Sequence, residues 1–328
     1  MAKVLITAAT LADKVGPYLP RLRDAGLEIV YPNPWDGQLL EADLFRELPG
    51  IKAVIAGSEP YTRKVLAAAK SLRAIARVGV GYDAVDVAAA TENAIAVTIT
   101  PGANHDAVAE HTFALLLAAA KSVAISDHLL KAGQWKRDIT MPLRGRTMGI
   151  VGLGRIGKAV ALRAIAFQMK VAAYELFPDK EFVARHGISL VTLDTLFTEA
   201  DFVSLHAPMG AETKHLINRR TLGMMKRDAI LLNTARGGLV CEPDLVEALK
   251  SKRIAGAALD VFEDEPLPKD HPLTNLDNVV LTPHTAGTDW QSRMDMAVMA
   301  AESIVALSKG EWPAAQVVNP EIRERFRW

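Results

Sequence analysis

The sequence contains almost no cysteine and no excess of either charge. Cys241 is the only cysteine in 328 residues, so the chain cannot form an intrachain disulfide or a zinc or iron–sulfur site held by several cysteines. Lys and Arg together number 38, as do Asp and Glu. This balance gives no support to a broad surface for nucleic acid, and we expect neither a nucleic-acid partner nor a metal centre.

The sequence also lacks an apolar run long enough to cross a membrane. The strongest run covers 113–120 and is flanked by Glu110, His111 and Lys121, whereas a spanning helix needs about 20 apolar residues. The first six residues predict a strand that ends at Thr7, and they lack the apolar core of a signal peptide. We therefore expect a cytoplasmic protein with no membrane segment.

Short β-branched runs alternate with helical patterns along most of the chain. This alternation is typical of βαβ units around a parallel sheet, and the length favours about two domains. Two helices are expected to be longer than the rest, one from 104 to about 131 and one from 289 to about 308. The sequence predicts strands at 4–7, 53–56, 73–77, 146–152, 171–175, 202–206, 229–234, 255–261 and 279–282.

The two long helices suggest how the chain is divided into domains. One continuous run of strand–helix alternation lies between them, so we predict that this run is one domain inserted into another. The inserted domain covers 101–287, and residues 1–100 and 288–328 together form the second domain. The long helices would then carry the chain between the two.

A glycine-rich loop follows the strand predicted at 146–152. The glycines of this G-x-G-x-x-G pattern are Gly152, Gly154 and Gly157; they permit a tight turn, close approach of a pyrophosphate, and close packing of helix on strand. The next strand ends at Glu175, 23 residues after Gly152, where an acid binds the adenosine ribose of NAD and repels the additional phosphate of NADP. The pattern predicts a Rossmann-type NAD site, although Arg155 leaves NADP open.

Three later segments each place a charged or titratable residue just after an apolar strand. They deliver Arg236, Asp260 with Glu265, and His284. Because ligands bind beyond the carboxyl ends of the strands in open α/β sheets, we expect these side chains to lie where the nicotinamide binds.

The chemistry of these side chains fits the oxidation of a secondary alcohol. A histidine accepts the hydroxyl proton while a hydride leaves, a carboxylate fixes the tautomer of that histidine, and an arginine binds a substrate carboxylate through two hydrogen bonds. The sequence predicts these roles for His284, Glu265 and Arg236 respectively.

At this point the sequence resembles the NAD-dependent D-2-hydroxyacid dehydrogenases, the superfamily of phosphoglycerate dehydrogenase, hydroxypyruvate and glyoxylate reductases and D-lactate dehydrogenase. The resemblance extends from about Ala53 to Ser308. Besides the glycine loop, the motifs that carry it are Arg77-Val78-Gly79-Val80-Gly81-Tyr82-Asp83, Thr100-Pro101-Gly102-Ala103-Asn104, Val108-Ala109-Glu110-His111, Asn233-Thr234-Ala235-Arg236-Gly237-Gly238, Asp260-Val261-Phe262, Glu265-Pro266 and Pro283-His284.

The resemblance implies a fold, an assembly and the roles of particular residues. A Rossmann-type doubly wound parallel sheet would be inserted into a flavodoxin-like α/β substrate domain, and the chain would form a homodimer partly through the long helix after Asn104. The catalytic residues would be Arg236, Glu265 and His284. The substrate would contact Ser58, Val78, Gly79, Asn104 and Arg236. NAD would contact Gly152, Gly154, Arg155, Ile156, Gly157, Glu175, His206, Pro208, Thr213, Thr234, Ala235, Asp260, His284 and Gly287.

The identity of the hydroxy acid stays open at this stage. Phosphoglycerate members usually carry an Arg before Ser58, where this chain has Gly57, and Glu59 would oppose an anion. Arg77 and Arg137 favour a phosphorylated substrate instead. The expected function is hydride transfer between NAD(H) and a small D-2-hydroxy or 2-oxo acid. The alternative is a binding protein that senses NAD(H) without turnover, as the corepressors of the family do.

Overall fold

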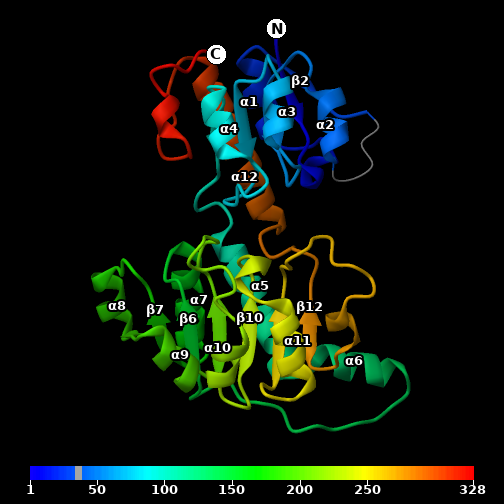
Figure 1. The fold of residues 1–328 in the computed structure, drawn as a ribbon, viewed down its shortest axis with the longest axis vertical. Helices are drawn as coiled ribbons and strands as arrows, with labels where there is room; N and C mark the ends of the chain where they lie inside the picture. The colour runs from blue at the N-terminus through cyan, green and yellow to red at the C-terminus, as the bar shows by residue number, and fades with distance from the viewer. Residues whose placement is uncertain (34–38) are drawn as a thin grey trace. The chain divides into compact units, whose positions relative to one another are not determined.

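The computed structural model describes residues 1–33 and 39–328 and divides into two compact units. Unit 1 comprises Met1–Asn104 and Gly287–Trp328, and unit 2 comprises His105–Ala286. Figure 1 shows both termini in unit 1. The predicted insertion, 101–287, starts four residues before the observed boundary and ends one residue after it.

Unit 1 is built on a parallel sheet of five strands in the order β2-β1-β3-β4-β5. This is the flavodoxin-like order, which confirms the predicted fold of this part. The strands are β1 (Ala2–Ile6), β2 (Leu27–Val30), β3 (Ile51–Ala56), β4 (Ala74–Arg77) and β5 (Ala96–Thr98). The sequence analysis missed β2 and β5.

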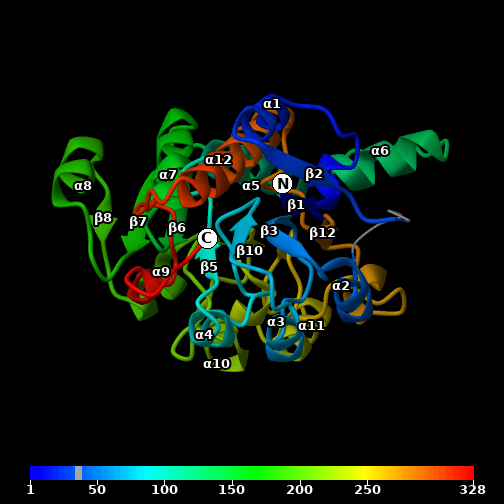
Figure 2. The same cartoon turned by 90° about the horizontal axis from the view of Figure 1, so that it is seen from above.

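Helices cover both faces of this sheet. Figure 2 shows α1 (Tyr18–Asp24) and α12 (Trp290–Ser308) together on one face, with α2 (Glu41–Glu47), α3 (Arg63–Ala68) and α4 (Val87–Glu92) on the other. Val4 and Ile6 of β1 pack with the first group, whereas Leu5 packs with the second. A strand buried on both faces has no need of polar residues, which is why β1 reads as a continuous apolar run.

Unit 2 is built on a parallel sheet of seven strands in the order β12-β11-β10-β9-β6-β7-β8. The order is that of a Rossmann sheet with one additional strand at its edge, which confirms the predicted fold class. The strands are β6 (Thr147–Val151), β7 (Lys170–Tyr174), β8 (Ser189–Leu190), β9 (Phe202–Leu205), β10 (Ile230–Asn233), β11 (Gly256–Leu259) and β12 (Val279–Leu281).

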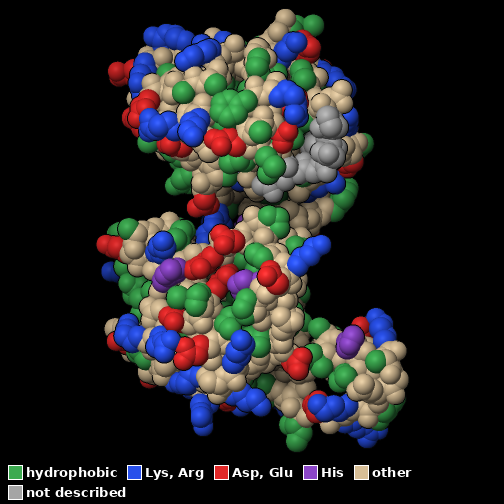
Figure 3. Space-filling model, turned by 45° about the vertical axis from the view of Figure 1, so that its right-hand side comes forward, with side chains coloured by type: hydrophobic (Ala, Val, Ile, Leu, Met, Phe, Trp, Pro, Cys, Tyr) green, Lys and Arg blue, Asp and Glu red, His purple; other side chains and the backbone are tan. Residues whose placement is uncertain are grey.

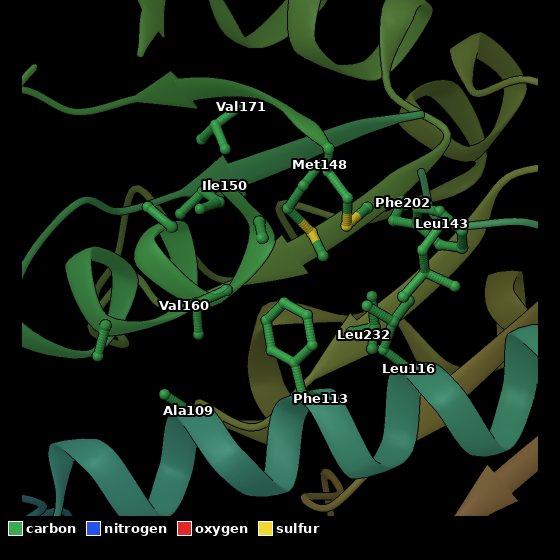
Figure 4. Packing of buried hydrophobic residues seen from close by; sticks show 14 of the residues in the cluster. Ala109, Phe113, Leu116, Leu143, Met148, Ile150, Val160, Val171, Phe202 and Leu232 are labelled. Atoms are coloured by element: carbon green, nitrogen blue, oxygen red, sulfur yellow. The ribbon is translucent and has the colours of Figure 1, made fainter. Parts of the chain in front are cut away.

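Two apolar cores hold the helices of unit 2 on its sheet. One core lies under α5 (His105–Ala120), α7 (Arg155–Ala166) and α8 (Lys180–His186); the other lies under α9 (Leu193–Glu199), α10 (Arg219–Met224) and α11 (Glu242–Lys250). In Figure 4, Phe113 and Leu116 of α5 point toward Met148 of β6 and Val160 of α7. Each large apolar side chain buried in this way contributes about 1.5–3 kcal/mol.

The prediction of one long helix from 104 to about 131 is wrong. The structure has two helices, α5 and α6 (Val123–Lys131), which are bent by 59° relative to each other. Ser122 adopts a left-handed conformation with φ of 52°, and the amide of Met141 donates to the carbonyl of Ala120. The end of α5 is thus satisfied by another segment, and continuing the helix would break that contact.

No single helix in the described part of the chain is long and apolar enough to cross a membrane. Only α5 and α6 taken together have the required length and composition, and they do so as a bent pair.

Candidate active site

The predicted catalytic residues of unit 2 lie at one edge of its sheet. Arg236 follows β10, Asp260 and Glu265 follow β11, and His284 follows β12. These three strands are neighbours and run parallel. Their carboxyl ends therefore meet at the edge where open α/β sheets bind ligands.

His284 and Glu265 form a hydrogen-bonded pair. The distance from His284 Nδ1 to Glu265 Oε2 is 2.6 Å, and Glu265 Oε1 accepts a hydrogen bond of 3.0 Å from the amide of Phe262. The two side chains are 49% and 35% exposed, so the pair is accessible from outside unit 2. In Figure 3, histidine and acidic side chains lie beside one another on the surface of unit 2.

The pair changes the pKa of both members. The hydrogen bond that His284 donates to Glu265, together with the negative charge of Glu265, raises the pKa of His284 above 6.5, although burial and Arg236 oppose the increase. Burial alone would raise the pKa of Glu265. The hydrogen bond and charge of His284, with smaller contributions from Phe262 and Arg236, outweigh this effect and lower it below 4.5. The opposite shifts widen the pH range over which both partners are charged.

Asp260 fixes the loop that carries His284. His284 has φ of 52°, a conformation that non-glycine residues rarely adopt. The carboxylate of Asp260 is fully buried and accepts hydrogen bonds from the amides of Thr285 at 2.9 Å and Ala286 at 2.8 Å, and from the Thr282 hydroxyl at 2.6 Å. These bonds hold the unusual backbone in place. Asp260 was predicted as a cofactor contact; within the described chain its carboxylate contacts this loop and His111 of α5.

His111 is a residue of this site to which the sequence analysis assigned no role. Its Nε2 lies 3.0 Å from the hydroxyl of Thr282, the first residue after β12. Because that hydroxyl donates its own hydrogen to Asp260, it accepts the hydrogen of His111. The motif Val108–His111 was recognised in the sequence, but its partner lies 171 residues away.

The Arg236 loop contacts the Glu265 loop. The Asn233 side chain holds the turn, accepting from the amide of Ala235 at 3.0 Å and donating to the carbonyl of Arg236 at 2.8 Å. A Cβ on Gly237 would lie 1.9 Å from the carbonyl carbon of Phe262. The two backbones are therefore packed as closely as a glycine allows.

The glycine loop of unit 2 has the features needed for a dinucleotide. Gly152 has φ of 94°, and a Cβ there would lie 2.8 Å from the backbone of His206. A Cβ on Gly157 would lie 2.1 Å from the carbonyl oxygen of Gly152. Gly154, at the N-cap of α7, has no described atom within 4 Å of its Cβ position. The first and last glycines are required by packing, and the middle one leaves room for a phosphate beside free helix amides.

Glu175 is fixed at the end of β7 by two backbone amides. Leu153 donates to its Oε2 at 2.7 Å and Phe177 donates to its Oε1 at 3.0 Å. The amide of Leu153 belongs to the glycine loop itself. The acid and the loop are thus joined in one turn, which fits the adenosine end of NAD.

The other predicted cofactor residues of unit 2 border the same sheet edge. Burial lowers the pKa of His206 to about 3, which keeps the ring neutral, and its buried Nδ1 has no hydrogen-bond partner among the described residues. The Thr213 hydroxyl closes a turn by donating to the carbonyl of Pro208 at 2.8 Å, and Thr234 is hydrogen-bonded to Thr112 of α5 at 2.9 Å. Arg155 and Ile156 begin α7, Ala235 precedes Arg236, and Gly287 is the first residue of unit 1 after the insertion.

The residues predicted to bind substrate in unit 1 lie after β3 and β4 and at the boundary. Two of them differ from expectation, because the Val78 amide already donates to the carbonyl of Ala56 at 2.9 Å and the Gly79 amide to the Thr100 hydroxyl at 3.0 Å. Within the described chain the next two amides, those of Val80 and Gly81, donate to no other group. Sequence alone could not show which of these amides already donate to other groups of the chain.

Asn104 and Glu59 of unit 1 have buried polar atoms. The Oδ1 of Asn104 is buried and accepts no hydrogen bond from the described residues, whereas Ser58 is exposed. Glu59, expected to oppose an anion, is only 1% exposed, and burial raises the pKa of its carboxyl. Its side chain lies against Gly57 rather than at the surface.

Sequence comparison places the chain in a family. Residues 113–286 match the sequence profile of the D-isomer specific 2-hydroxyacid dehydrogenase, NAD binding domain. The chain therefore belongs to the D-2-hydroxyacid dehydrogenase family, and it is an NAD-dependent oxidoreductase that acts on hydroxy acids.

The chain is similar to individual enzymes of known name. The chain is 45% identical over 271 residues to the glyoxylate reductase of Korarchaeum cryptofilum, covering 81% of both chains. It is 42% identical over 320 residues to the D-3-phosphoglycerate dehydrogenase of Archaeoglobus fulgidus, covering 97% of this chain and 59% of the relative. The D-lactate dehydrogenase of Aquifex aeolicus, crystallised with NAD and lactic acid, has a similar structure with a TM-score of 0.85 at 28% identity, covering 97% of this chain and 99% of that one.

Proposed function

We propose that this enzyme interconverts a small 2-oxo acid and its D-2-hydroxy acid, with His284 and Glu265 as the acid–base pair and Arg236 as the carboxylate ligand. The observation that carries the proposal is the 2.6 Å contact between His284 Nδ1 and Glu265 Oε2 at the carboxyl edge of the Rossmann sheet. An ionised carboxylate accepts the Nδ1 hydrogen, which leaves Nε2 as the ring atom that exchanges a proton with a ligand.

In the direction of reduction, NADH held by the glycine loop and Glu175 would supply the hydride to the carbonyl carbon of the substrate. His284, as the imidazolium, donates its Nε2 proton to the carbonyl oxygen and becomes neutral. His284 keeps its Nδ1 hydrogen throughout and donates it to Glu265, whose carboxylate stabilises the charged ring, which is why the pKa of His284 is raised. In the direction of oxidation the neutral ring accepts the same proton from the hydroxyl.

The substrate carboxylate requires fixed hydrogen-bond donors. The guanidinium of Arg236 supplies two parallel N–H groups, and an ammonium cannot reproduce their geometry. In unit 1 the amides of Val80 and Gly81 make no hydrogen bond within the described chain, so they are available to a ligand carboxylate. We assign them this role in place of the amides of Val78 and Gly79.

We propose that the substrate is a small unphosphorylated acid, such as glyoxylate or hydroxypyruvate. The turn after β3 contains Gly57 and Ser58 and offers no cation to a phosphate. Arg77 is largely buried, and its Nε donates to the carbonyl of Gly81 at 3.0 Å. Arg137 lies over the Trp135 ring on an exposed segment of unit 2.

The test is turnover of NADH with glyoxylate, hydroxypyruvate, pyruvate and 3-phosphohydroxypyruvate. We expect glyoxylate or hydroxypyruvate to have a kcat/KM at least about tenfold above that of the phosphorylated acid. A preference for 3-phosphohydroxypyruvate would overturn the substrate class. NADH binding with no turnover of any of these acids would favour the alternative, a sensor of NAD(H).

We further propose a homodimer that uses α6. This helix has no buried residue within the described chain, and it exposes Val123 at 54% and Leu130 at 57%. Trp135, just beyond it, is 77% exposed. Light scattering coupled to gel filtration measures the assembly, and a monomer at micromolar concentration would contradict the proposal.

A further inference from the structure

Glu242 is a buried carboxylate to which the mechanism gives no role. It is the first residue of α11 and is only 6% exposed. Its Oε1 accepts a hydrogen bond of 2.8 Å from the amide of Glu263, and its Oε2 lies 3.2 Å from His271 Nε2. A buried carboxylate is costly unless it is fully hydrogen-bonded, so these contacts need an explanation beyond packing.

The orientation of the His271 ring fits a donor to Glu242. The amide of Leu273 donates to His271 Nδ1 at 3.4 Å, so Nδ1 is the acceptor of the neutral ring. Nε2 therefore carries the hydrogen and points it at Glu242. This bond fixes the carboxylate so that its other oxygen faces the Glu263 amide.

Three contacts hold Glu263 in place. Its amide is bound by Glu242, its side chain is bonded to His215 Nε2 at 2.5 Å, and its peptide group packs on Gly237. The amide of His215 in turn donates to the carbonyl of Gly238 at 2.8 Å. Glu263 thus joins the loop that carries Glu265 to the loop that carries Arg236.

We propose that Glu242 is a positioning residue for the reaction: by holding the Glu263 amide it fixes the loop 262–265, and through that loop it places Glu265 against His284. Three consecutive hydrogen bonds connect them, from Glu263 to Glu242, from Phe262 to Glu265, and between Glu265 and His284. The inference rests on the proposed function of the last pair.

Two substitutions separate the reach of the side chain from its charge. Glu242→Asp keeps the charge but shortens the side chain by one carbon–carbon bond, about 1.5 Å, which moves the acceptor beyond hydrogen-bonding distance of the Glu263 amide. Glu242→Gln keeps the length and the Oε1 acceptor for the Glu263 amide, but it replaces the charged acceptor toward His271 by an amide NH2 group, which cannot accept the Nε2 hydrogen. Glu247→Gln is the matched control, since Glu247 lies on the same helix and forms an exposed ion pair with Arg219.

We expect Glu242→Asp to lower kcat by about tenfold or more, since a misplacement of about 1 Å can cost about a hundredfold. The KM for NADH should stay constant, and the basic limb of the pH profile for reduction should move to lower pH because His284 loses part of its contact with Glu265. Glu242→Gln should keep kcat within about threefold of the parent, although it lowers the melting temperature, and Glu247→Gln should match the parent.

Two results would overturn the proposal. One is a Glu242→Asp enzyme with the parent kcat and pH profile; the other is equal loss of kcat in both Glu242 variants, which would show that the reach of the side chain does not govern the rate. Nuclear magnetic resonance titration of His284, assigned with the His284→Asn variant, provides a readout that does not depend on turnover. If the parent protein reduces no 2-oxo acid, the proposed function fails, whereas a lower pKa of His284 in Glu242→Asp would still support positioning.

Discussion

Gly237 lies where the loop that carries Arg236 touches the loop that carries Glu265, and Gly237→Ala tests whether they must touch. The added methyl would lie 1.9 Å from the carbonyl carbon of Phe262 and 2.4 Å from the amide nitrogen of Glu263. Non-bonded carbon atoms pack best at about 3.5–4.0 Å. The loops must therefore separate by about 1.5 Å or more, because both atoms belong to backbone and neither can rotate away.

The expected loss follows from that displacement. A shift of about 1 Å in a catalytic group can cost about a hundredfold in rate, so we expect kcat to fall by about 100-fold or more. Overpacking costs about 1–3 kcal/mol of stability, so the melting temperature should also fall. NADH binding should fall less than kcat, since Gly152, Gly154 and Gly157 lie on another loop of the same unit.

The neighbouring glycine provides the control. A methyl on Gly238 would lie 2.8 Å from Met209 Cε, the mobile end of a flexible side chain that can move aside. Gly238→Ala should therefore keep kcat within about threefold of the parent. The assay is steady-state oxidation of NADH with glyoxylate, accompanied by thermal melts and NADH fluorescence titration. A folded Gly237→Ala enzyme with the parent kcat would refute the idea that the contact positions both side chains.

Three further substitutions address the pair, the carboxylate ligand and the cofactor. Glu265→Gln should lower kcat by about 10- to 100-fold. The basic limb of the pH profile for reduction should also move to lower pH, because Glu265 raises the pKa of His284. The control variant Asp264→Asn should leave that limb in place. Arg236→Lys should raise the KM for glyoxylate by about tenfold or more, since one ammonium cannot make the paired bonds; an unchanged KM would contradict the assignment. Glu175→Ala should raise the ratio of kcat/KM for NADPH to that for NADH by about tenfold, and no change in that ratio would remove Glu175 from cofactor selection.

The strands that position the site were predictable because buried strands consist mostly of apolar residues. Strands β9, β10 and β11 are buried along their whole length and read as apolar runs. The edge strand β2 begins Leu27-Glu28-Ile29 and is only partly buried, so its pattern did not distinguish it from a loop. The end of α5 was missed because Lys121 and Ser122 are not helix breakers, and the helix ends there through contacts with Met141.

The charged residues of the candidate site were predictable for a different reason. Arg236, Glu265 and His284 each follow a strand closely, so the parallel topology alone brings them to one edge of the sheet. The residues that hold them in place left no such signal. Glu242 binds a peptide 21 residues away in the sequence, and its partner is a backbone amide that every residue possesses.

The conformation of His284 shows why these supporting contacts matter. A left-handed backbone at a non-glycine residue costs about 1–2 kcal/mol, and the sequence Pro283-His284-Thr285 contains nothing that would favour it locally. Asp260 offsets that cost by accepting two amides and a hydroxyl from the same loop, each such bond to a buried carboxylate contributing about 1.5–3 kcal/mol. The ring of His284 is therefore aimed by a carboxylate at the end of the neighbouring strand, while its charge is set by a second carboxylate on the loop beyond. Because both carboxylates follow β11, a displacement of that one strand end would alter the direction and the pKa of the catalytic ring together.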